Sequence, residues 1–135
     1  MKIRIVVPCP LITWKTVAWG EPGEEQYRSS QEAIRHAVQS SPRREDLRKW
    51  LESRTKLYLE VTFCLSNRRV SKSDMDSLLS DLLNPLVEGA CGPRPAGKPI
   101  PQTKDSLFWQ ILATKVQDQD EKIVMDISEF KSVMK

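Results

Sequence analysis

The chain has 135 residues and a formal net charge of +3 at pH 7. This length suits one compact domain, residues 1–135, and the apolar content is sufficient for a core of its own. No apolar run is long enough to span a membrane, and the N-terminus lacks the long apolar segment and small-residue cleavage site of a secretory signal. We therefore expect a cytoplasmic protein. The few cysteines and histidines argue against a disulfide framework and a four-ligand zinc site. They are Cys9, Cys64, Cys91 and His36.

The first half of the chain predicts one strand and two helical pieces. The β-branched stretch 2–7 is typical of a strand, and we expect a loop over residues 8–28. Ser29 and Glu32 then match a capping box at the start of an amphipathic helix. A second helical piece begins at Pro42, since proline is favoured at the first helical position.

The second half predicts one helix and three strands. Residues 57–65 alternate between apolar and polar side chains and form the clearest predicted strand. A basic loop follows, and apolar residues at helical spacing from Met75 predict an amphipathic helix that Pro85 kinks or ends. Residues 106–117 and 121–128 predict two strands paired as an antiparallel hairpin. The order β-α-β-α-β-β indicates an α+β domain, with a mixed β-sheet and helices packed on one face.

Basic side chains gather in two stretches of the sequence. The first holds Arg43, Arg44, Arg48, Lys49, Arg54 and Lys56. The second holds Arg68, Arg69 and Lys72. Such clusters can face a polyanion, or they can be ordinary solvated surface, and charge alone does not decide between the two.

Two aspartates, Asp74 and Asp76, stand one residue apart where the helix after the basic loop begins. One interpretation is structural: Ser73 and Asp76 match a capping box, and negative charge is favoured at a helix N-terminus. The other is a metal site, because Mg²⁺ prefers oxygen ligands and tolerates two like charges close together. Residues i and i+2 of a helix do not share a face, so both can reach one ion only if Asp74 lies in the entry turn and Asp76 inside the helix.

A third carboxylate would strengthen such a metal site, and Asp105 is the candidate. It precedes a predicted strand and follows Lys104. If that strand lies beside the helix, it could bring Asp105 to the aspartate pair. Oxygen ligands that hold Mg²⁺ among basic side chains are a common arrangement for cutting a phosphodiester, because the metal activates water and the cations hold the backbone.

Six segments of the chain follow one another in a recognisable order. They are LYLEVTFCL, NRRVSKS, DMD, SLLSDLL, KDSLFWQILATKV and EKIVMDIS. From Leu57 to Phe130 this order resembles the RusA family of Holliday-junction resolvases, in which a strand and a basic loop precede a D-x-D pair that opens a helix. In that family a further aspartate stands shortly before a long strand. The N-terminal IVVPCPLITWK is also similar to the family's opening strand and its Pro-x-Pro turn.

The resemblance implies a homodimeric, Mg²⁺-dependent endodeoxyribonuclease, with Mn²⁺ as a substitute metal. Such enzymes bind four-way DNA junctions and resolve them by paired nicks during DNA recombination and repair. By position, the resemblance assigns catalysis and metal binding to Asp74, Asp76 and Asp105. It assigns DNA binding to Arg68, Arg69, Lys72 and Lys104.

The chain departs from the family pattern inside the helix that follows the D-x-D pair. Ser77 stands where the family often has asparagine, and Ser80 stands where it has a functionally important lysine. Two other functions therefore stay open. One is a non-catalytic relative that binds branched DNA. The other is a small structural or interaction domain in which Asp74 and Asp76 are only helix-start charges.

Overall fold

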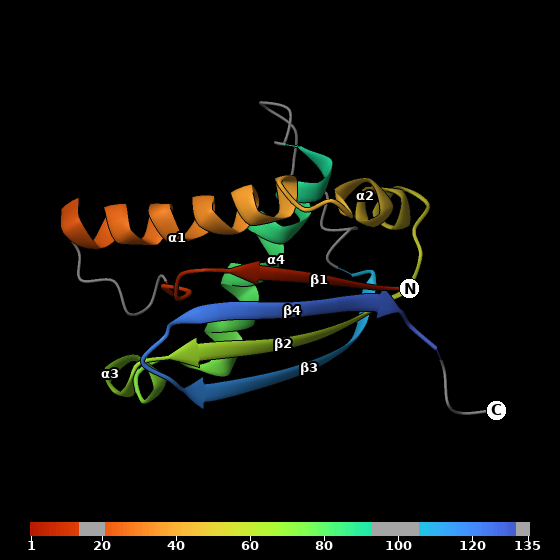
Figure 1. Ribbon diagram of the computed structural model, residues 1–135. Coiled ribbons are helices and arrows are strands. Elements are labelled where there is room, and N and C mark those ends of the chain that lie inside the picture. The colour runs from red at the N-terminus through yellow and green to blue at the C-terminus, as the bar shows by residue number, and fades with distance from the viewer. Residues whose placement is uncertain (14–20, 93–105, 132–135) are drawn as a thin grey trace.

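The computed structural model describes residues 1–13, 21–92 and 106–131, and the fold is α+β (Figure 1). Four strands form one mixed sheet in the order β1-β4-β2-β3. Among the described residues, no helix is both long and apolar enough to cross a membrane. In chain order the elements are β1 (Lys2–Val7), α1 (Glu21–Gln39), α2 (Arg44–Glu52), β2 (Leu57–Leu65), α3 (Asn67–Val70), α4 (Met75–Cys91), β3 (Phe108–Gln117) and β4 (Lys122–Glu129).

Alternating burial along the strands places the core on one face of the sheet. β1, β2 and β4 all bury one set of alternate side chains, because successive side chains of a strand point to opposite faces. These side chains form a single cluster with buried residues of α1, α2 and α4. The opposite face carries exposed apolar side chains on both edge strands, which are Val6, Leu112 and Val116. The predicted arrangement of a mixed sheet with helices on one face is confirmed.

The two strands near the C-terminus do not form the predicted hairpin. β4 pairs with β1 and β2, and β3 pairs in parallel with the other side of β2. The prediction failed because β4 buries three consecutive residues, Met125 to Ile127, and so needs a neighbour on each side, whereas β3 is a largely exposed edge strand. The short link between them passes the end of β2, where the Asp118 amide donates to the Leu65 carbonyl at 2.9 Å.

The start of one helix and the structure of one predicted loop also differ from the sequence prediction. α1 begins at Glu21, so it occupies part of the predicted loop 8–28, and Ser29 lies inside the helix rather than at its cap. Pro22 falls in the first turn of α1, where proline leaves no hydrogen bond unmade. The predicted basic loop contains the single turn of α3.

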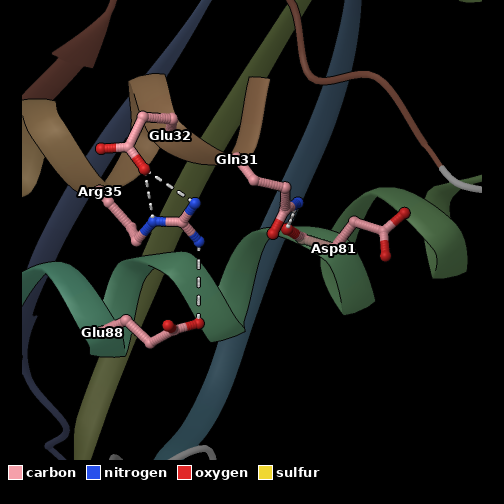
Figure 2. Close-up of polar contacts among 5 residues, drawn as sticks. All are labelled: Gln31, Glu32, Arg35, Asp81 and Glu88. Carbon is pink, nitrogen blue, oxygen red and sulfur yellow. Dashed lines mark hydrogen bonds and ion pairs between the residues drawn. The ribbon is translucent and has the colours of Figure 1, made fainter. Parts of the chain in front are cut away.

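α4 does not end at Pro85, and its continuation has a specific cause. A proline at position 85 cannot donate to the carbonyl of Asp81, four residues earlier in the helix. The side-chain amide of Gln31, on α1, donates to that carbonyl instead, at 2.7 Å (Figure 2). Arg35 makes a second contact between the two helices, since its guanidinium lies 4.0 Å from the carboxylate of Glu88 on α4. The same guanidinium lies 2.9 Å from the carboxylate of Glu32 on α1. Contacts from α1 therefore hold α4 on both sides of Pro85, at Asp81 and at Glu88.

Candidate functional site

The second basic stretch (Arg68, Arg69 and Lys72) and the aspartate pair lie between the end of β2 and the first turn of α4, in the segment that contains the short helix α3 (Figure 1). The chain leaves β2 at Leu65, forms the one turn of α3, and enters α4 at Met75. β2 and β3 are parallel, and the described segments place this entry beside the carboxyl-terminal part of both strands. That end of parallel strands is where α/β sheets commonly bind ligands.

Asp74 is the N-cap residue of α4, with an extended backbone (φ −74°, ψ 140°), and Asp76 lies in the first turn. The entry-turn geometry that a shared ion requires is therefore present in the backbone. The predicted capping box between Ser73 and Asp76 is wrong, because the helix begins one residue later and its N-cap makes no side-chain hydrogen bond. Within the described part of the chain, neither carboxylate has a hydrogen bond or ion pair, and both side chains are exposed.

The three basic residues before the pair have different environments. Arg69 is paired with Glu121, with 3.1 Å between its Nε and the carboxylate, and the same carboxylate accepts the Ser66 amide at 3.1 Å. This contact fastens α3 to the link between β3 and β4. Arg68 and Lys72 are exposed, and neither has an ion pair among the residues the structure describes. Two positive charges in the segment that precedes Asp74 therefore stay available to a ligand.

A cavity of about 410 Å³ lies against this basic turn. All three predicted DNA-binding cations of the turn line it, together with a strip of loop and helix residues. The full lining is Leu11, Ile12, Gln26, Ser66, Arg68, Arg69, Lys72, Ser73 and Glu121. Ser73, which lines the cavity, directly precedes Asp74 in the chain, and among the described residues the lining does not extend to the aspartate pair.

Sequence analysis missed one residue of this region, Lys115 on β3. Its ammonium donates to the carbonyl of Val70 at 2.9 Å and to the carbonyl of Ser73 at 2.9 Å. A signal was present, since Ile111, Ala113 and Lys115 share the part-buried face of β3, where a lysine is unusual.

Asp105 and Lys104 lie outside the described residues, so their predicted roles stay predictions. The nearest described residues are Ser106 and Leu107, and the Leu107 carbonyl accepts the Leu57 amide at the amino-terminal end of β2. Asp74 follows the other end of that strand. Leu107 therefore lies at the end of the sheet opposite to the aspartate pair.

Over residues 1–13, 21–92 and 106–131, no three histidine, cysteine or acidic side chains gather as a metal-binding group. Asp74 and Asp76 supply the two carboxylates that the structure places at the start of α4. No protein-family model matches the chain, and no curated protein matches it at a significant level.

Proposed function

We propose that the chain is a Mg²⁺-dependent endodeoxyribonuclease of the RusA type, which binds four-way DNA junctions and nicks them in pairs. The observation that carries the proposal is the pair of exposed, unpartnered carboxylates at the entry to α4, next to the unpaired cations Arg68 and Lys72 in the described part of the chain. A pure helix cap would instead hydrogen-bond the amides of the first turn, and Asp74 does not do so.

The two carboxylates of Asp74 and Asp76 are of the kind that Mg²⁺ takes as ligands. Magnesium in phosphoryl-transfer sites is commonly held by one or two carboxylates, with water and substrate phosphate completing its shell. Asp74 and Asp76 would supply those carboxylates, and the family resemblance adds Asp105 as a third. Bound there, Mg²⁺ would activate water and neutralise charge on the phosphate.

The protein's own side chains bind and orient the DNA. Arg68 and Lys72 would hold phosphates of the backbone without reading base sequence. Arg69 has a second role, because its contact with Glu121 fixes the turn that presents the other two cations. A homodimer with two-fold symmetry would address two opposed strands at once, and we include that dimer and a cytoplasmic location in the proposal.

One assay tests the proposal. The purified chain is incubated with a synthetic four-way junction and with a linear duplex, with Mg²⁺ or with a chelator. We expect paired nicks on the junction that require the metal and that fall by at least about 100-fold in Asp76→Asn and Asp74→Asn, as for loss of a group that acts in the chemical step. Asp46→Asn, a change of the same kind on α2, should cleave normally.

Ser80 favours a second function. It is exposed on α4, four residues after Asp76, where the resemblance leads one to expect a lysine. In a non-catalytic relative, the junction would bind more tightly than the duplex, but no nicks would form with Mg²⁺ or Mn²⁺. A chain with no preference for any DNA would contradict both functions and leave a structural or interaction domain.

A further inference from the structure

Lys115 is a lysine in an unusual place. It stands on the part-buried face of β3 and is paired in register with Phe63, a fully buried residue of β2. Its side chain runs from the sheet to the turn between α3 and α4, and its ammonium meets two backbone carbonyls there. An ammonium is a strong donor, and hydrogen bonds from a charged group are stronger than those between neutral groups.

The two carbonyls that Lys115 binds bracket one short segment. Val70 is the last residue of α3, and Ser73 immediately precedes the N-cap of α4. Carbonyls at a helix end have no partner within the helix, so the Val70 carbonyl needs an outside donor. One cation from a neighbouring strand therefore fastens both ends of residues 70–73, which lead directly into Asp74.

We propose that Lys115 is a positioning residue for the aspartate pair. It fixes the peptide before Asp74, and that peptide sets the direction in which the carboxylates of Asp74 and Asp76 leave the backbone. The proposal rests on the proposed function, because it gives the pair the task of holding a divalent cation. The ammonium itself does not touch the cation or the DNA; it acts through the backbone that it binds.

The test compares three variants of the full chain: Lys115→Met, Lys115→Arg and Lys122→Met. Mn²⁺ binding is titrated by electron paramagnetic resonance, and junction cleavage gives kcat and KM. We expect Lys115→Met to weaken Mn²⁺ binding by about tenfold, as for other groups that orient a metal ligand, and to lower kcat with little change in KM. Lys115→Arg should keep most of the Mn²⁺ affinity and most of kcat, since a guanidinium can also donate to two carbonyls. Lys122→Met, on β4 and separated from β3 by β2, should behave as the wild type.

Hydrogen exchange separates this role from a general loss of stability. In Lys115→Met the amides of residues 71–76 should exchange faster, while those of β2 and β4 stay protected. If Lys115→Met does not fold, Lys115→Gln is measured in its place. A folded variant with wild-type Mn²⁺ affinity and wild-type kcat would overturn the inference.

The two proposals can fail separately. A wild-type chain that binds Mn²⁺ through Asp74 and Asp76 but does not cut DNA contradicts the nuclease, and the Mn²⁺ titration of Lys115→Met still decides the positioning role. A wild-type chain that binds no Mn²⁺ contradicts both the metal site and the positioning role of Lys115.

Discussion

Arg4 and Asp126 form a two-point ion pair on the open face of the sheet. Nε of Arg4 donates to one carboxylate oxygen at 2.8 Å, and Nη2 donates to the other at 2.9 Å. The hydrogen bonds from Arg4 hold the pKa of Asp126 below its ordinary value, although burial of the carboxyl acts in the opposite direction. A carboxyl with a lowered folded-state pKa contributes stability above its unfolded pKa, near 4, and loses it as pH falls through the lowered value.

We therefore predict a pH-dependent effect of Arg4→Met. At pH 7 the variant should unfold several degrees lower than the wild type, because a nearly buried carboxylate loses its partner. Below about pH 4 the two melting temperatures should converge, since protonation removes the charge that Arg4 stabilises. Melting curves between pH 2 and 8 measure this. Arg28→Met, which breaks an exposed contact to Glu24, should not change the profile. Parallel curves for wild type and Arg4→Met would contradict the account.

At the candidate site, sequence reasoning located the aspartate pair but not its surroundings. Two aspartates ahead of an apolar helical repeat place Asp74 and Asp76 at a helix start, and the structure has them there. The choice of Asp74 rather than Ser73 as N-cap, and the hydrogen bonds from Lys115 to the Val70 and Ser73 carbonyls, could not be predicted in the same way. Lys115 lies 42 residues from Ser73, so nothing in the local pattern indicates that the two meet. Contacts of this kind follow from the strand order.

At the level of elements, the hydrogen bond from Gln31 to the Asp81 carbonyl explains why α4 continues past Pro85. Pro85 leaves one carbonyl of α4 without its usual donor, and the amide of Gln31 replaces that donor. A buried carbonyl without a partner costs about 1–3 kcal/mol. Gln31 is itself buried, so water does not readily take its place.

We predict that Gln31→Ala destabilises the chain by about 1–3 kcal/mol, because it leaves the Asp81 carbonyl unsatisfied. The same change should cost less in a Pro85→Ala background, where the helix supplies its own amide donor at position 85. Urea unfolding of the four chains of this double-mutant cycle gives the coupling energy. Gln39→Ala, the same change at an exposed position of α1, is the control. Equal costs of Gln31→Ala in both backgrounds would mean that Pro85 is not the reason for the contact.

The elements themselves were predicted with uneven success, for physical reasons. β2 has strict two-residue alternation, and its predicted and observed bounds agree. The partners of β3 and β4 were predicted wrongly because chain proximity suggested a hairpin between them, whereas burial decided the sheet order. A short link normally joins neighbouring strands, and in this fold it passes the end of β2 instead.

For the whole molecule, the structure separates two basic stretches that look alike in the sequence. In the first, Arg48 is paired with Glu45 and Glu52, and Arg43 is paired with Asp46. Lys49 and Arg54 of the same stretch have no ion pair within the described ranges, so the charge of this surface is only partly balanced. In the second, Arg69 is paired, whereas Arg68 and Lys72 have no ion pair within the described ranges and keep their full charge at the entry to α4. Unpaired cations therefore occur in both stretches, and those of the second stretch directly precede the aspartate pair.

This distribution predicts which cations bind DNA. The slope of log K against log salt concentration is negative. Each phosphate contact that is removed should reduce its magnitude by about 0.9, because fewer counterions are released on binding. We expect that loss for Arg68→Ala and for Lys72→Ala, with weaker junction binding at low salt and a smaller difference at high salt. Fluorescence anisotropy of a labelled four-way junction, titrated at several salt concentrations without Mg²⁺, measures the slope. Arg48→Ala removes the same charge from an ion-paired position on α2 and should leave the slope unchanged. If all three variants reduce the magnitude of the slope equally, the DNA does not distinguish paired from unpaired cations, and the contact surface extends well beyond the turn before Asp74.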